Sequence, residues 1–190
     1  MTAQIPDTLT LDGIEYALAG IDGEQPFDPA EFGLNPVGRC TACYRGYVCG
    51  YRLHDGTLRL DRLRLTHQAE LPPGVRQPPG PPLNGISPKR PPRGMLDFNC
   101  QYEGLNLALP FSGGLLLGRD FVPELYVHMG FHPAWKYREV VELHFVDGVL
   151  AQREDRSAAM AQFRATLAPG QRIVPSRDFI ASAFSREYKI

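Results

Sequence analysis

Apolar and polar residues alternate in several short stretches of the chain, and three of these stretches turn back at an Asp-Gly pair. The pairs are Asp12-Gly13, Asp55-Gly56 and Asp147-Gly148. Asp-Gly accepts the positive φ angles of a type I′ turn, and the twist of that turn matches two antiparallel strands. The pattern therefore predicts three β-hairpins, at residues 8–18, 47–65 and 140–152.

A further apolar stretch extends the predicted sheet. Residues 108–117 are interrupted by Ser112-Gly113-Gly114, so they add one or two strands. The 19 glycines and 18 prolines favour many short strands and loops over a helical bundle. We expect a mainly β, or β-rich α+β, fold in a single domain over residues 1–190. Its form would be an antiparallel sandwich or an open barrel built from hairpins.

Helical patterns are few. Residues 28–33 have the cap, the first-turn proline and the terminal glycine of a helix of one or two turns. Residues 155–167 give the strongest helical pattern, with Asp155 or Ser157 as the cap, and residues 176–184 repeat the plan. One or two C-terminal helices should therefore cover one face or one end of the sheet.

The middle of the chain contains a proline-rich segment. Residues 72–93 hold nine of the 18 prolines and no acidic residue. Proline cannot donate a hydrogen bond to a strand ladder, so the segment is predicted to be a loop. The stretch from Pro88 to Arg93 matches a P-x-x-P-x-Arg ligand for aromatic-lined grooves. A loop that is exposed, or that lies over a sheet edge, is the simpler expectation.

Charge is unevenly distributed around a net value of -1. Residues 1–38 carry seven acids and no Lys or Arg, whereas residues 39–93 carry ten Lys or Arg and three acids. The first interpretation is that the acidic segment packs beside the basic one. The alternative is a nucleic-acid surface, in which arginines contact phosphates and rings stack on bases. Its residues would be Arg39, Arg45, Arg52, Arg59, Arg62 and Arg64 with Tyr44 and Tyr47. Nucleic acid is the less favoured partner, because Arg45 and Arg52 point to opposite faces of one predicted strand.

The first residues have no basic region followed by an apolar one, and no run approaches 18 apolar residues. We therefore expect no signal peptide and no membrane span, and a cytoplasmic location. Cysteines are kept reduced in that compartment.

Three of the four cysteines lie close together, which raises the question of a metal or redox site. Cys40 and Cys43 form a C-x-x-C pair, and Cys49 follows in a predicted strand. Zinc commonly takes two such pairs, and a redox pair needs a thiol at a helix N-terminus. Neither arrangement is indicated, so we expect the thiols to fill the core. No metal and no cofactor is predicted.

The predicted strand 43–54 has one apolar face and one unusual face. On the unusual face, Gly46 and Gly50 leave a trough beside Arg52, where a ligand or another backbone could approach closely. The simpler expectation is that another part of the chain fills this trough.

The densest group of functional side chains lies in residues 126–137. Aromatic rings and two histidines converge there on a loop that contains Gly and Pro, which predicts a ligand platform. The candidate ligand-binding residues are Tyr126, His128, His132, Trp135 and Tyr137, together with Arg52. The alternative is a packed aromatic corner. A metal on the two histidines is disfavoured, because Gly130 and Pro133 break the helix that their spacing would need.

Glu142 and His144 alternate with apolar neighbours and should share the outer face of a strand, where we expect them to be solvated. An acid–base pair would form if they met His128 across strands.

Three segments, residues 43–63, 111–121 and 125–148, resemble parts of a family of small, β-rich, uncharacterised bacterial proteins. The shared features are an aromatic-Arg-Gly strand with a Leu-rich return strand, an aromatic-Ser-Gly stretch and a Tyr-Val-His-Met-Gly turn. The resemblance implies no function, and the proline-rich loop and Cys40 lie outside it.

The chain has no esterase elbow around Ser112 and no phosphate-binding loop. We therefore expect a binding or interaction protein with a protein partner or a small ligand, one form of which is a bacterial immunity- or defence-type protein. The first alternative is a hydrolase or isomerase with a small pocket around His128 and His132. The second is nucleic-acid binding through residues 39–93.

Overall fold

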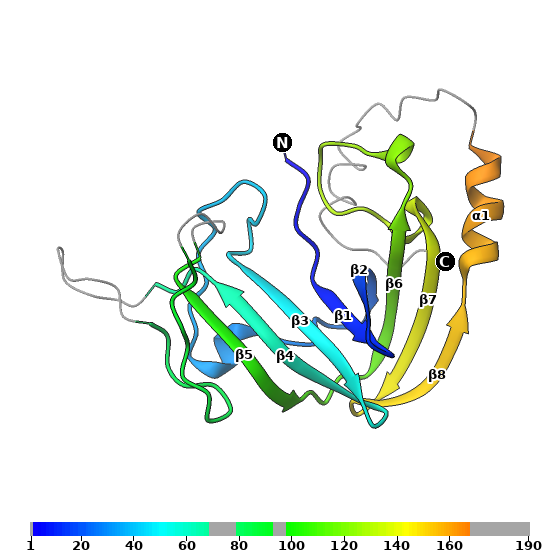
Figure 1. Cartoon of the computed structure of the whole chain (residues 1–190). Coiled ribbons are helices and arrows are strands. Elements are labelled where there is room, and N and C mark those ends of the chain that lie inside the picture. The colour runs from blue at the N-terminus through cyan, green and yellow to red at the C-terminus, as the bar shows by residue number, and fades with distance from the viewer. Residues whose placement is uncertain (1, 69–78, 93–97, 168–190) are drawn as a thin grey trace.

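A computed structural model of the chain describes residues 2–68, 79–92 and 98–167 (Figure 1). The strands are β1 (Thr8–Leu11), β2 (Ile14–Asp22), β3 (Tyr47–His54), β4 (Thr57–Leu65), β5 (Cys100–Ala108), β6 (Gly113–Phe121), β7 (Tyr137–Val146) and β8 (Val149–Asp155). The helical elements are the 3₁₀ turns η1 (Pro29–Phe32), η2 (Pro123–Leu125) and η3 (Ala134–Lys136) and the helix α1 (Ser157–Thr166). The fold is therefore β-rich with a helix after the last strand, as predicted.

All eight described strands belong to one strongly curved sheet. Its order is β3-β1-β2-β6-β7-β8-β4-β5, and β3 also pairs with β4, so the sheet returns on itself. The contact between β8 and β4 is a single pair, Thr57 with Val149. An open barrel, one of the two expected forms, describes this arrangement. One neighbouring pair, β1 and β3, runs parallel, which the hairpin pattern did not predict.

The three predicted hairpins are confirmed as β1–β2, β3–β4 and β7–β8. At each turn the aspartate has φ between 48° and 52° and the glycine has φ between 71° and 79°, the values of a type I′ turn. The turns of β3–β4 and β7–β8 also bond to each other, because Leu58 N donates to Gly148 O and Leu150 N donates to Gly56 O. Local turn chemistry thus closes one end of the barrel.

The short predicted helices are largely confirmed. η1 is capped by Asp28, whose side chain accepts from Ala30 N, and it ends at Gly33 with φ 70°. α1 begins at Ser157 with Arg156 at the cap position, so neither predicted cap, Asp155 or Ser157, occupies it. The Asp155 side chain still accepts a hydrogen bond from Ser157 N at 2.8 Å. The predicted helix at 176–184 lies outside the described residues.

The described part of the proline-rich segment, residues 79–92, lies along the outer edge of β5. Lys89 and Gln101 exchange two backbone hydrogen bonds of 2.8 Å, and the Tyr102 hydroxyl donates to Pro81 O at 2.6 Å. These bonds cover part of an edge that would otherwise expose unpaired backbone groups. The expectation of a loop over a sheet edge is met in this part.

The barrel interior is filled by side chains. Tyr51 and Tyr102 are fully buried among leucines from six strands, and Cys49 and Cys100 lie in the same core. Cys43 is buried in a smaller cluster, Cys40 is half-buried, and all four thiols are free. Within the described residues, no group of three or more His, Cys, Asp or Glu could hold a metal ion. The buried thiols therefore act as apolar filling.

β3 begins at Tyr47, so the predicted strand 43–54 is wrong over its first four residues, and Gly46 lies before the strand with φ 76°. The space expected to form a trough at Gly46 and Gly50 is filled by the chain itself. A Cβ at Gly50 would lie 3.1 Å from Arg62 Cβ, and a Cβ at Gly46 would lie 2.5 Å from the Val37 backbone. The simpler expectation for this face is therefore correct.

Acids of the N-terminal segment pair with arginines of the basic segment. Asp7 binds Arg45 through two hydrogen bonds of 2.8 and 3.2 Å, and Glu15 binds Arg62. These contacts agree with the first interpretation of the charge distribution, in which the acidic segment packs beside the basic one. No helix in the described ranges has the length and apolar character that crossing a membrane requires.

Candidate functional site

Residues 122–136 connect β6 to β7 and lie at the end of the barrel away from the hairpin turns (Figure 1). Val122 N donates to Lys136 O at 2.8 Å, which closes the base of this connection. Further along, Gln4 N donates to Gly130 O at 2.8 Å and ties the connection to the N-terminal segment. The backbone that carries the candidate residues is therefore held at both places.

Five rings of this region form a cluster, which we call the aromatic corner: Phe121, Tyr126, His128, His132 and Tyr137. The Phe121 ring lies 4.8 Å from the His132 ring and 5.3 Å from the Tyr137 ring, measured between centroids. Tyr126 lies 5.3 Å from His132 and is 53% exposed. The Tyr126 hydroxyl is 2.9 Å from His128 Nδ1. The structure thus brings four of the sequence-predicted residues together with Phe121, which the sequence did not single out.

Trp135 belongs to the same connection but points toward α1. Its ring lies 5.9 Å from the Phe163 ring of α1. From the next residue of the helix, Arg164 Nη1 donates to Trp135 O at 2.9 Å and to Tyr137 O at 2.6 Å. Trp135 therefore helps to fix α1 against the base of the aromatic corner.

Tyr137 is held by a glycine on the neighbouring strand. A Cβ at Gly118 would lie 2.5 Å from the Tyr137 ring, so the ring occupies the space that a side chain would take. Burial raises the pKa of the Tyr137 phenol to about 12. At neutral pH its ring therefore acts as neutral filling beneath Phe121.

Lys136 is a buried, titratable residue of this connection that the sequence patterns did not single out. Its side chain is 3% exposed, and its Nζ lies 3.5 Å from His132 Nδ1 and 5.4 Å from the Trp135 ring. No carboxylate of the described part of the chain forms an ion pair with it. Burial lowers the pKa of Lys136 to about 8, and burial together with the Lys136 charge lowers the pKa of His132 to about 4.

Arg52 does not join the aromatic corner. It is exposed on β3 and pairs with Asp61 of β4 at 3.0 Å. β3 is not a neighbour of β6 or β7 in the sheet. Its contacts in the described part of the chain are local to the β3–β4 hairpin.

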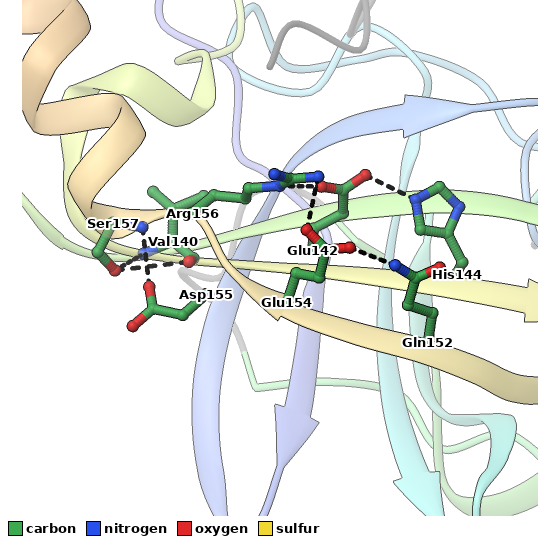
Figure 2. A network of polar contacts seen from close by, with 8 residues as sticks. All are labelled: Val140, Glu142, His144, Gln152, Glu154, Asp155, Arg156 and Ser157. Atoms are coloured by element: carbon green, nitrogen blue, oxygen red, sulfur yellow. Dashed lines mark hydrogen bonds and ion pairs between the residues drawn. The ribbon is translucent and has the colours of Figure 1, made fainter.

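Glu142 and His144 do share the outer face of β7, but the expectation that both are solvated is wrong (Figure 2). Glu142 is 1% exposed, and its two oxygens bind Arg156 Nε and His144 Nε2, the latter at 2.6 Å. Arg156 also reaches Glu154 at 2.7 Å. Arg156 covers the carboxylate from the segment between β8 and α1, far along the chain, which explains why strand alternation could not predict the burial.

The same network fixes the start of α1. Arg156 N donates to Val140 O at 2.8 Å, and Val140 N donates to Ser157 Oγ at 3.0 Å (Figure 2). Because both Glu142 oxygens are engaged, the carboxylate serves as an anchor for Arg156. His128 bonds to Tyr126 instead of to this network, so the proposed three-residue acid–base group does not assemble.

A cavity of about 610 Å³ lies elsewhere, between residues 24–32 and residues 108–112. Phe27 and Phe32 line it, with their rings stacked at 5.1 Å, beside the carboxyl groups of Glu24, Asp28 and Glu31. The sequence patterns gave no indication of this hollow, because it forms between two segments that are distant in sequence.

The chain was compared with protein families, curated proteins and solved structures. No protein family, no curated protein and no solved structure matches the chain significantly.

Proposed function

We propose that the protein is a non-catalytic binding protein that contacts a protein partner through the aromatic corner, as a bacterial immunity- or defence-type protein does. The observation that carries this proposal is the exposed pair of Tyr126 and His128, joined by a hydrogen bond of 2.9 Å. Tyrosine offers a large contact area with few rotatable bonds, so little conformational entropy is lost when it is buried in an interface.

The rings behind this pair support the proposal, because they fix its position before a partner arrives. Tyr126 rests against Phe121 at 6.4 Å and against His132 at 5.3 Å between centroids. The backbone hydrogen bond from Val122 N to Lys136 O holds the connection closed. A contact surface that is already ordered loses less free energy on binding than a mobile one.

The rest of the described structure offers less support for a hydrolase or isomerase. The core of the barrel is occupied by fully buried side chains such as Tyr51 and Tyr102. The Glu142 carboxylate is engaged by His144 and Arg156. A general base needs a free lone pair within reach of substrate, and both Glu142 oxygens already accept from side chains of the fold.

Nucleic-acid binding is likewise less supported. Arg45 is turned to Asp7, Arg62 to Glu15 and Arg52 to Asp61. An arginine that is already neutralised by a carboxylate contributes little to counterion release from a nucleic acid.

The proposal is tested by site-dependent capture from an extract of the host cell. Immobilised wild type is compared with the double variant Tyr126→Ser/His128→Ser and with Val149→Ser. Val149 is a matched control, because it is also more than half exposed but lies beyond the other end of β7. A true partner is retained by wild type and by Val149→Ser and is lost with the double variant.

The captured protein is then purified, and its dissociation constant is measured by calorimetry. Loss of a central aromatic contact should weaken binding at least about tenfold. Equal retention of every captured protein by all three forms would show that the aromatic corner is not the contact surface.

A further inference from the structure

The Lys136 amine is buried in a setting that ordinary structural lysines avoid. A buried ammonium group is normally paired with a carboxylate, because an isolated charge is costly in an apolar environment. Around Lys136 Nζ the described residues supply an aromatic ring at 5.4 Å and the His132 ring nitrogen at 3.5 Å. The Trp135 ring attracts the ammonium form, but neither neighbour carries a negative charge, so burial favours the neutral amine, which carries a free electron pair.

His132 is placed to exchange a proton with that amine. A neutral imidazole with its proton on Nε2 presents a lone pair at Nδ1, the atom that faces Lys136. His132 is half-buried, and its ring also touches the exposed Tyr126 ring at 5.3 Å. Because Lys136 is only 3% exposed, the proposal is confined to small molecules.

We propose that Lys136 is a nucleophilic amine that forms an imine with a small aldehyde, and that His132 is the group that exchanges the proton. The lone pair of Nζ attacks the carbonyl carbon, and a C–N bond forms as the C=O π bond breaks. Nζ loses one proton to His132 Nδ1, and His132 passes that proton to the carbonyl oxygen, which becomes a hydroxyl group. Nζ then loses its second proton by the same route to this hydroxyl group, which leaves as water as the C=N bond forms. Amine and aldehyde give imine and water, and no oxidant or reductant is consumed.

The low pKa of Lys136, about 8, agrees with this chemistry. At pH 7 about a tenth of such an amine is neutral, whereas an ordinary lysine amine is almost wholly protonated. The exposed Lys89 provides an internal comparison within the same chain.

The test is competitive labelling of the folded full-length chain with propionaldehyde and cyanoborohydride at pH 7, followed by peptide mapping by mass spectrometry. Cyanoborohydride reduces each imine to a stable propyl amine. We expect Lys136 to be labelled at least about tenfold faster than Lys89, from the difference in neutral amine. The preference should disappear in 8 M urea, where both lysines meet the same solvent.

Two variants test the assigned roles. His132→Gln keeps a polar side chain that cannot carry the proton, so labelling of Lys136 should slow about fivefold or more while labelling of Lys89 is unchanged. Lys136→Arg should remove the fast-labelled peptide. Labelling of Lys136 at or below the rate of Lys89 in the folded wild type overturns the proposal, whether or not the variants fold.

The inference goes beyond partner binding and does not depend on it. Labelling is measured without a partner, so a failed capture leaves this result intact. If the labelling experiment fails, the capture experiment still tests the contact surface of Tyr126 and His128.

Discussion

Arg45 forms a two-bonded ion pair with Asp7, whose side chain is completely buried. The same carboxylate accepts a hydrogen bond from Cys49 N at 2.8 Å, so one acidic side chain joins the N-terminal segment to β3. Arg45 in turn lies 4.6 Å above the Tyr47 ring. The pairing with Asp7 raises the pKa of Arg45 and outweighs the opposing effect of its burial.

We predict that Asp7→Asn lowers the free energy of unfolding by about 3 kcal/mol, because it leaves a largely buried guanidinium without its counter-charge. Urea denaturation followed by tryptophan fluorescence measures the change. Asp61→Asn is the control, since it removes a charge from the exposed pair with Arg52 and should cost less than about 1 kcal/mol. If Asp7→Asn and Asp61→Asn lower the free energy of unfolding equally, the buried Asp7 pair contributes no more stability than an exposed ion pair.

We predict that Glu142→Gln destabilises the protein by about 3 kcal/mol and loosens the start of α1. The substitution removes the charge that Arg156 and His144 share, and Arg156 is the residue that leads into the helix (Figure 2). Hydrogen exchange of the amides of residues 156–160 should speed up along with the loss of stability.

Glu139→Gln is the matched control for this prediction. Glu139 lies on the same strand, but its pair with Arg119 is exposed, at 3.1 Å, and such pairs contribute less than about 1 kcal/mol. If the amides of residues 156–160 exchange equally fast in both variants, Glu142 does not anchor the start of α1.

The hairpins could be predicted because each is determined by two adjacent residues. The Asp55-Gly56 pair, for example, adopts the positive φ angles that its two residues favour locally. The parallel pairing of β1 with β3 has no such local signal. It brings Thr8 opposite Gly50, and only the packing of the whole barrel determines that register.

The candidate site was predictable to a similar degree. Local composition located the rings from Tyr126 to Tyr137, and strand alternation placed Glu142 on the outer face of β7. What alternation could not supply is the covering side chain, because Arg156 arrives from beyond β8. The burial of Lys136 likewise depends on the closure of a long connection, whereas its sequence position suggests an exposed lysine.

We predict that the four thiols separate into one accessible and three protected groups. Cys40 is half-buried, whereas Cys43, Cys49 and Cys100 are buried, and burial raises the pKa of Cys43 and Cys100. Titration of the folded protein with a disulfide reagent at pH 8 should show one fast thiol, and three more should react after unfolding. Cys40→Ser should abolish the fast phase. Rapid reaction of all four thiols would be incompatible with cysteines that fill the core.

The His132 side chain should make stability depend on pH in a defined window. Its folded pKa, about 4, lies below the usual value of 6.5, mainly because of burial and partly because of the nearby Lys136 amine. Between these values the unfolded chain binds a proton that the folded chain does not, so the free energy of unfolding decreases as the pH falls from 6.5 toward 4. Above pH 6.5 both states carry the neutral ring, and this contribution is constant.

We therefore predict that the stability of wild type relative to His132→Gln falls by about 2 kcal/mol between pH 7 and pH 5. Urea denaturation at intervals of half a pH unit measures both proteins under the same conditions, which cancels the titration of the carboxylates they share. His54→Gln is the control, because the His54 side chain is 56% exposed and meets water in both states. The difference in free energy of unfolding between wild type and His132→Gln could instead stay constant from pH 7 to pH 5. The His132 ring would then take up its proton as easily in the folded protein as in the unfolded chain. The aromatic corner would be more open to water than the contacts of Phe121 and Tyr126 indicate.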